Sequence, residues 1–274
     1  MRNIRRIAFI GGGNMAQSLV GGLIAAGHAA ETIAIAEPDP TRRERLKRYA
    51  GASITADNAE VVAGATLVVL AVKPQVVPKA LAEAAATLAK ERPTLLSIAA
   101  GVRIAAITAA VGAELPVVRA MPNTPALIGR GASAFYANAA TDEASRRLAR
   151  EVLESVGIAI EVEEEAQLDA VTAVSGSGPA YFFLLVEALA RAGIAAGLPT
   201  HTAERLAAAT GAGAMALLDE SGETPAALRE RVTSPGGTTA AALDAFESKG
   251  FEAIVEHAVR RAVERSRELG DMEH

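Results

Sequence analysis

Four short stretches of this 274-residue chain contain residue types that can hold anionic groups: three combine glycine with hydroxyl-bearing or amide residues, and one contains a lysine. They are residues 11–16 (GGGNMA), 71–74 (AVKP), 175–179 (SGSGP) and 234–239 (SPGGTT). Glycine lets the backbone approach a ligand closely, and free N–H groups in such turns bind phosphate or carboxylate oxygens. The stretches therefore predict binding sites for anions.

Composition narrows the chemistry and the partners. The chain has no cysteine, which excludes disulfides, thiolate metal sites and cysteine nucleophiles. Its histidines are far apart in sequence and none forms a pair with metal-ligand spacing, so we expect no metal. A net charge of −5 disfavours nucleic acid, because phosphate backbones attract basic surfaces. We expect a small-molecule partner.

The amino terminus imitates the start of a secretion signal without completing one. Basic residues precede an apolar run at residues 7–10, but three glycines and then Asn14 and Gln17 interrupt that run. No uninterrupted apolar stretch reaches membrane-spanning length. We expect a cytoplasmic protein with no membrane partner.

Short β-type runs alternate with helical patterns over the first 162 residues. The expected strands are residues 7–10, 32–36, 66–72, 94–98, 116–119, 132–136 and 158–162. This alternation predicts an α/β fold with a doubly wound, mostly parallel sheet. After the acidic residues 163–165 only helical patterns follow. We predict a dinucleotide-binding domain over residues 1–165 and an all-helical domain over residues 166–274.

The helical part has few large side chains from which to build a core. Only 3% of the whole chain is aromatic, and small residues such as Ala207, Gly211 and Ala214 recur at helical spacing. Small residues let helices approach closely, either within one chain or between subunits. Because a lone bundle of this composition would be thinly stabilised, we favour an interface between subunits.

The first glycine stretch follows an expected strand and opens an apolar helix. Its pattern, Gly11-x-Gly13-x-x-Ala16, suits a tight turn, a close approach to a pyrophosphate and packing of the helix on the strand. N–H groups at the helix start would then hold the diphosphate. This context predicts a dinucleotide site.

Glu37 ends the second expected strand, 21 residues after Ala16. A carboxylate there usually accepts hydrogen bonds from the adenosine ribose and repels a 2′-phosphate, which favours NADH. Arg42 and Arg43 begin the next helix and could instead hold a 2′-phosphate. The two signals conflict, so the preference between NADH and NADPH stays open.

Three other stretches are placed where ligands bind. Residues 71–74 and 97–101 follow strands at the carboxyl edge of the sheet, where they could line the ribose and nicotinamide. Residues 234–239 place glycine N–H groups and hydroxyls before a helix, a second anion site. Residues 175–179 place two glycines and a proline within a helical stretch. These residues destabilise a helix, and such local destabilisation is expected at functional sites.

With these motifs in place, the sequence closely resembles the pyrroline-5-carboxylate reductase family, from residue 7 to the final helix. The resemblance is carried by residues 9–16 (FIGGGNMA), 71–75 (AVKPQ), 119–125 (RAMPNTP), 169–172 (DAVT) leading into 175–181 (SGSGPAY), and 232–239 (VTSPGGTT).

The resemblance implies a Rossmann domain followed by a helical domain that interlocks with a partner chain as a homodimer or a dimer-based homodecamer. It also implies reduction of 1-pyrroline-5-carboxylate to L-proline by NADPH or NADH, the last step of proline biosynthesis. Glu37 departs from family members with small hydroxylated residues or a basic group there, which again leaves the cofactor preference open.

Individual roles follow by motif. The resemblance assigns the diphosphate to Gly11, Gly13, Asn14 and Met15, the adenosine side to Asn58, and the ribose and nicotinamide to Ala71, Val72, Lys73, Pro74, Ala99 and Ala100. It assigns the substrate carboxylate to Ser234, Gly237, Thr238 and Thr239.

A protonated cyclic imine is already an electrophile, so its reduction requires no strong general acid. We therefore expect positioning to dominate catalysis. Thr239, Ser175 and Thr172 are the candidates for holding the ring nitrogen or relaying its proton.

Two other readings stay open. A β-hydroxyacid dehydrogenase would need a cationic acid, usually a helical lysine in the second domain, whereas the only lysine beyond residue 90 is Lys249, between Ser248 and Gly250. A nucleotide-sensing regulator would bind the dinucleotide without turnover, but that function would not require the second anion site at residues 234–239.

Overall fold

The computed structural model describes residues 5–272, whose contacts form two units. The first unit contains the chain through Ser177 together with the C-terminal stretch from Ala262, and the second unit is Gly178–Arg261. Each unit is described separately below.

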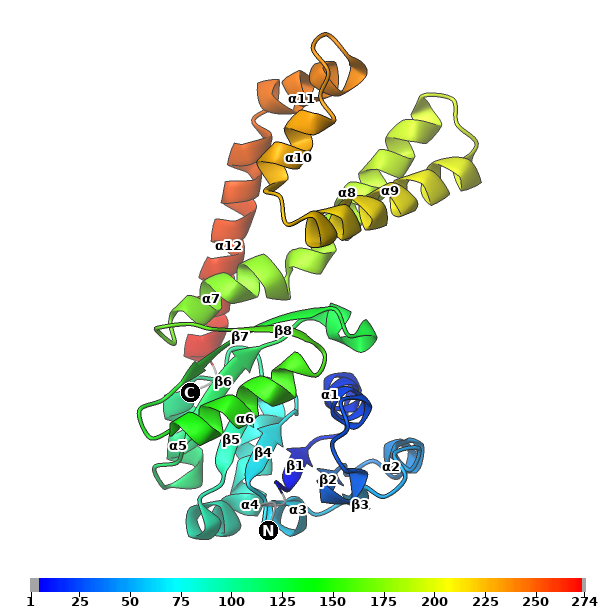
Figure 1. The fold of residues 1–274 in the computed structure, drawn as a ribbon. Coiled ribbons are helices and arrows are strands. Elements are labelled where there is room, and N and C mark those ends of the chain that lie inside the picture. Colours follow the sequence, from blue (N-terminus) through cyan, green and yellow to red (C-terminus); the bar gives the residue numbers. More distant parts are fainter. Residues whose placement is uncertain (1–4, 273–274) are drawn as a thin grey trace. The chain divides into compact units, whose positions relative to one another are not determined.

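An eight-stranded sheet forms the centre of the first unit, in the order β3-β2-β1-β4-β5-β6-β7-β8 (Figure 1). The strands are β1 (Ile7–Ile10), β2 (Ile33–Ala36), β3 (Ser53–Thr55), β4 (Leu67–Leu70), β5 (Thr94–Ser97), β6 (Val117–Met121), β7 (Gly131–Ala137) and β8 (Gly157–Glu161). All neighbouring pairs are parallel except β6 and β7. The predicted doubly wound, mostly parallel sheet is confirmed.

All seven expected strands are present, β1 with the predicted ends and the other six with shifted ends, and β3 is an additional strand. β3 is three residues long and lies at the edge of the sheet, with none of its residues fully buried. A strand so short and exposed has no long apolar run, so its pattern did not distinguish it from a loop.

Helices cover both faces of the sheet (Figure 1). They are α1 (Asn14–Ala25), α2 (Pro40–Leu46), α3 (Asn58–Val62), α4 (Val77–Glu91), α5 (Ile104–Val111) and α6 (Glu143–Glu154), with short 3₁₀ turns η1 (Ala30–Thr32), η2 (Pro74–Val76) and η3 (Thr124–Ile128). Alternate strand residues point to opposite faces: Ile7 and Phe9 pack with α1 and α6, whereas Ala8 and Ile10 pack with α3, α4 and α5. Burial on both faces explains why these strands are continuously apolar.

Two helical stretches complete the first unit. α7 (Gln167–Val171) leads into the π-helical turn η4 (Thr172–Gly176). Asp169 of α7 accepts a hydrogen bond of 2.7 Å from the Ser266 hydroxyl in the C-terminal stretch. Farther along that stretch, Asp271 forms an ion pair of 2.7 Å with Arg103. Residues 175–179 (SGSGP) span the end of the π turn and the start of α8 (Gly178–Ala195). The helix therefore widens at this segment rather than ends.

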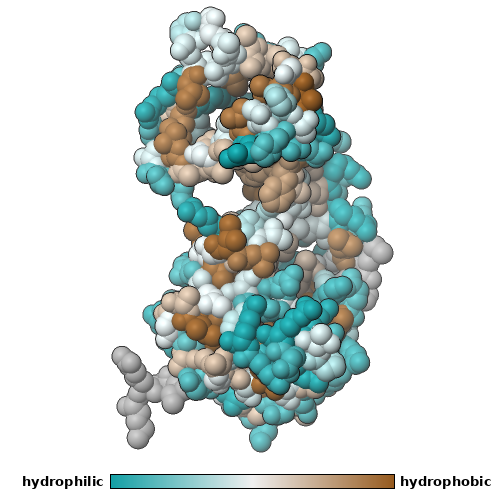
Figure 2. Space-filling model, turned by 90° about the vertical axis from the view of Figure 1, so that its right-hand side faces the viewer, coloured by the Kyte–Doolittle hydropathy of each residue, from teal (hydrophilic) through white to brown (hydrophobic). Residues whose placement is uncertain are grey.

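The second unit is helical. It contains α8 (Gly178–Ala195), α9 (Thr200–Ser221), α10 (Pro225–Arg231), α11 (Thr238–Ser248) and the first part of α12 (Phe251–Met272). Within residues 178–261 only Gly178, Ala190, Ala203 and Ala207 are buried. Many large apolar side chains of this unit are exposed, Phe183 by 69% and Ile254 by 61%. Figure 2 shows this apolar surface in brown.

One stretch, Gln167–Ala195, is long and apolar enough to cross a membrane by length and composition alone, with a mean hydropathy of 1.3 in its most apolar window. Its apolar residues are not continuous, because the stretch contains Asp169, Glu187 and Arg191. A long amphipathic helix that packs one face against other helices can have the same length and apolar composition as a membrane-spanning helix.

Candidate active site

The glycine loop after β1 has the shape its sequence predicted. Gly11 has φ +100°, and a Cβ there would lie 2.7 Å from the carbonyl oxygen of Ala71. A Cβ at Gly12 would lie 2.6 Å from Cδ1 of Leu46. Gly13 precedes α1 as its N-cap, and no side chain of the described residues caps that helix start. The first N–H groups of α1 are therefore available to a ligand.

A cavity of about 1120 Å³ opens above this loop. Its lining residues are Gly11, Gly12, Gly13, Asn14, Met15, Gln17, Glu37, Pro38, Arg42, Arg45, Arg48, Ala71, Val72, Lys73, Val76 and Ile98. The structure thus brings together eight of the predicted dinucleotide residues, from three different strand ends. The donor set fits a dinucleotide, because helix N–H groups face a diphosphate position and arginines extend along one side.

Glu37 lies at the end of β2 and is 4% exposed. Its Oε2 atom accepts the Gly12 N–H at 3.0 Å, and its Oε1 atom accepts the Asp39 N–H at 3.1 Å. Nη1 of Arg42 lies 4.0 Å from Oε2. The carboxylate therefore fixes the glycine loop in addition to lining the cavity.

The two arginines that were expected to compete with Glu37 point in different directions. Arg42 lines the cavity, whereas Arg43 donates to the carbonyl oxygens of Glu37 and Pro38, both at 2.7 Å. Sequence reasoning missed Arg45 and Arg48, which also line the cavity. For Arg45 the available signal was its spacing of three residues from Arg42, because such spacing keeps side chains on one helix face. Arg48 lies in the turn after α2, where helical spacing gives no signal.

Asp39 begins α2 as its N-cap. Its carboxylate accepts the N–H groups of Arg42 at 3.2 Å and Thr41 at 2.7 Å, and these bonds hold the pKa of Asp39 below its usual value. The ionised cap helps to fix the helix that carries Arg42 and Arg45.

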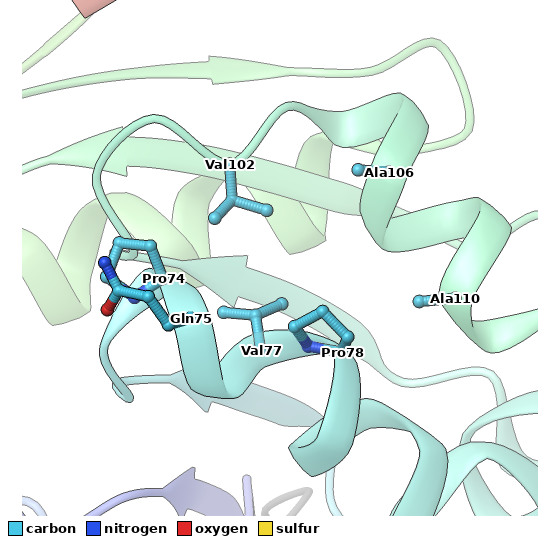
Figure 3. Close-up of a pocket in the computed structure, with 7 residues that line it drawn as sticks. All are labelled: Pro74, Gln75, Val77, Pro78, Val102, Ala106 and Ala110. Carbon is cyan, nitrogen blue, oxygen red and sulfur yellow. The ribbon is translucent and has the colours of Figure 1, made fainter. Parts of the chain in front are cut away.

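Four predicted cofactor residues do not line the cavity. Asn58 begins α3 and donates its amide to Glu83 at 2.6 Å. Pro74 begins η2 and lines a separate apolar cavity of about 250 Å³, where Figure 3 shows it near Val77 and Val102. Ala99 is buried and Ala100 is exposed, while their neighbour Ile98 reaches the main cavity.

The π turn holds two of the three predicted catalytic hydroxyls. Thr172 donates its hydroxyl to the carbonyl oxygen of Leu168 at 2.8 Å, and Ser175 donates to that of Val171 at 3.0 Å. Both residues are half-buried. Because each hydroxyl proton is engaged, the remaining lone pairs make both groups hydrogen-bond acceptors.

The SPGGTT segment forms a turn before α11 in the second unit. Gly236 has φ +70°, and the Gly237 N–H donates to the carbonyl oxygen of Ser234 at 3.0 Å. Gly237 is the N-cap, with no side-chain cap from the described residues, and Thr238 and Thr239 are the first two residues of α11. The N–H groups of these threonines lie in the first turn, where no helical acceptor exists, so the segment can hold an anion.

Among residues 5–272, no group of three or more His, Asp or Glu side chains is arranged to bind a metal ion. The glycine-loop cavity offers helix N–H groups, arginines and the buried carboxylate of Glu37.

Two family models match the chain. Residues 165–269 match pyrroline-5-carboxylate reductase dimerisation, and residues 6–101 match the coenzyme F420-dependent NADP oxidoreductase family. The helical region thus matches a dimerisation domain, and the sheet region matches a family of NADP oxidoreductases.

Whole-chain relatives agree with these matches. A pyrroline-5-carboxylate reductase of Pseudomonas aeruginosa is 50% identical over 266 residues, 97% of each chain. The structure of one from Coxiella burnetii has a TM-score of 0.94 at 38% identity, over 97% of this chain and 99% of that one. One from Plasmodium falciparum with NADP bound has a TM-score of 0.82 at 30% identity, over 98% and 99%.

The relatives match both the glycine loop and the helical region over nearly their full length. The chain belongs to the pyrroline-5-carboxylate reductase family.

Proposed function

We propose that this chain reduces 1-pyrroline-5-carboxylate to L-proline with a hydride from NADPH or NADH, the last step of proline biosynthesis. The observation that carries the proposal is the glycine-floored cavity at the start of α1, in a chain that matches a pyrroline-5-carboxylate reductase over 97% of both lengths. The cofactor, when bound, supplies the hydride from its reduced nicotinamide.

The first unit binds the dinucleotide. Gly11, Gly13, Asn14 and Met15 surround the diphosphate at the start of α1, and Glu37 faces the adenosine ribose. On the nicotinamide side, residues 71–74 contribute with Ala99 and Ala100, and Asn58 serves the adenosine side. Contacts from Pro74, Ala99, Ala100 and Asn58 would require small shifts on binding, because these four residues do not line the cavity.

The turn before α11 binds the substrate carboxylate. Ser234, Gly237, Thr238 and Thr239 offer N–H groups and hydroxyls at a helix start, where the helix dipole favours a negative charge. This arrangement recognises the carboxylate that the imine and proline share.

The chain's own hydroxyls position the ring nitrogen. Thr172 and Ser175 already donate to backbone carbonyls, so their lone pairs can accept the N–H of a protonated imine, and Thr239 is the third candidate. When hydride adds to the imine carbon, the π electrons of the C=N bond become the lone pair of the amine nitrogen. The step consumes no further proton, so positioning is the main task of the protein.

The chain acts as an oligomer built from dimers. The dimerisation match over residues 165–269 and the exposed apolar side chains of the helical unit support this assembly. We propose a functional division into residues 1–165, which bind the dinucleotide, and residues 166–274, which bind substrate and dimerise. A homodimer or a homodecamer built from dimers, a cytoplasmic location, and no membrane or nucleic-acid partner complete the proposal.

The test follows cofactor oxidation by the purified chain with 1-pyrroline-5-carboxylate, using NADPH and NADH in parallel. We expect oxidation that depends on the imine and yields proline stoichiometrically. Oxidation or reduction only with a β-hydroxyacid couple would instead identify a hydroxyacid dehydrogenase. Dinucleotide binding without turnover of either substrate would identify a nucleotide sensor.

A further inference from the structure

Asn123 joins three segments of the first unit. It follows β6 and precedes η3, and it is 8% exposed. Its Nδ2 atom donates to the carbonyl oxygen of Ser175 in the π turn at 3.0 Å. Its Oδ1 atom accepts the N–H of Ala132 in β7 at 2.9 Å. One buried side chain therefore ties the π turn to the sheet.

The carbonyl oxygen of Ser175 needs a partner from outside its own helix. In an α-helix this oxygen would accept the N–H four residues later, which belongs to position 179. That residue is Pro179, and proline has no N–H. The buried Asn123 amide supplies a donor to this half-buried carbonyl in place of the N–H that proline lacks.

A second contact fixes the same turn. A Cβ at Gly176 would lie 2.6 Å from Cε of Met121, so the turn packs closely on the end of β6. The Ser177 N–H donates to the carbonyl oxygen of Thr172 at 2.8 Å, which is the five-residue bond of a π turn. The turn that displays the Thr172 and Ser175 hydroxyls is thus held against the end of β6 by two contacts, from Met121 and Asn123.

We infer that Asn123 is a positioning residue for catalysis: it sets the π turn so that the lone pairs of Thr172 and Ser175 face the reacting ring. The inference rests on the proposed function and adds a residue to which no role has been assigned above. Asn123 acts through Ser175 and Thr172, and the reacting atoms do not touch it.

The first variant is Asn123→Asp, which keeps an oxygen for the Ala132 N–H. As a protonated acid this side chain can still donate to the Ser175 carbonyl, whereas as a carboxylate it cannot and is repelled. Burial and the facing carbonyl raise the pKa of such a carboxyl group. The ratio of variant to wild-type kcat should therefore fall with rising pH, to about one tenth, the size of one lost hydrogen bond. Dinucleotide affinity should stay unchanged.

The second test is a rescue. Asn123→Ala removes the donor and should lower kcat about tenfold. Adding Pro179→Ala restores a backbone N–H four residues after Ser175, so the double variant should recover most of that loss. Pro179→Ala alone measures the effect of removing the ring, as a double-mutant cycle requires.

The outcomes separate the inference from the proposed function. If the wild type does not reduce the imine, the proposed function fails. The contact between Asn123 and the Ser175 carbonyl can then still be tested, because its loss in Asn123→Ala should speed hydrogen exchange of the Ser177 amide in the same turn. If the wild type is active, kcat within twofold of wild type in both Asn123 variants overturns the inference. A pH-independent loss without rescue overturns it too, as does failure of both variants to fold.

Discussion

The two units of this chain reach stability by different routes. The sheet unit completes its own core, with Phe9 and Phe135 fully buried between its layers. In the helical unit, residues 178–261, the buried side chains are alanines, while Phe183 and Ile254 are more than half exposed. An isolated helical unit would leave this apolar surface in water. The first unit is therefore a binding scaffold in its own right, and the second requires a partner.

Small residues explain how the helices of the second unit can pack closely while they bury little apolar surface. A Cβ at Gly193 of α8 would lie 3.3 Å from the Cβ of Ala203 of α9, and one at Gly211 would lie 3.2 Å from Cγ2 of Val186. Helices that meet through glycine and alanine approach closely but bury little apolar area per contact. The large side chains then remain on the outside, where a second copy can cover them.

The strongest test of the self-contained unit is Gly11→Ala. The new Cβ would lie 2.7 Å from the Ala71 carbonyl oxygen at a backbone φ of +100°. We expect a loss of about 3 kcal/mol in unfolding free energy and dinucleotide binding too weak to detect. Thermal unfolding and dinucleotide titration measure the two effects. Gly13→Ala is the matched control for stability, because its Cβ would meet no described atom within 4 Å. Equal stability of both variants would contradict the prediction.

The partner-dependent unit is tested by Phe183→Asp. A carboxylate on this exposed side chain of α8 should weaken self-association about 100-fold and lower activity in parallel. Dinucleotide affinity should persist, because the sheet unit has its own core. Light scattering and dinucleotide titration give the readouts, and Glu187→Gln, one turn along α8, is the control. A dimer of normal affinity would place the interface elsewhere.

A smaller effect should separate the binding roles of the two units. Thr239→Ala should lower kcat/KM for the imine about tenfold, because a hydroxyl at the start of α11 is lost while the dinucleotide cavity is untouched. Thr233→Ala is a matched control, since that hydroxyl donates to the Arg229 carbonyl at 2.6 Å. Unchanged steady-state kinetics in Thr239→Ala would remove this residue from the substrate site.

The smallest expected effect concerns the choice of dinucleotide. Glu37→Ser removes the carboxylate that would repel a 2′-phosphate and that lies 4.0 Å from Arg42. Arg42 then keeps only its exposed ion pair with Asp39, at 3.9 Å, and can bind such a phosphate. We expect the ratio of NADPH to NADH affinity to rise about fivefold, the size of one exposed charge interaction. Glu37→Gln, which can still accept the Gly12 N–H, separates charge from loop support. An unchanged ratio in both variants would exclude Glu37 from ribose recognition.

Local rules were sufficient to predict much of the lining of the cavity above the glycine loop. Gly11, Gly13 and Glu37 line it as expected, because a positive φ, a helix start and a strand end each favour particular residue types. Arg45 of α2 and Arg48 in the following turn were not predicted to line the cavity, because the direction of their side chains depends on how this segment packs on the sheet. Likewise, nothing local shows that Asn58 donates to Glu83, 25 residues away.

The sequence by itself determined every strand but β3 and their order along the chain, a glycine loop with one strained position, and a helical second part poor in large buried side chains. These features follow from periodicity and backbone sterics, which act over a few residues. Only the tertiary structure decided that Asn123 completes the hydrogen bonding of Ser175, 52 residues away, and which arginines face the cavity. Such contacts depend on how distant segments pack, and the same local pattern is compatible with many packings.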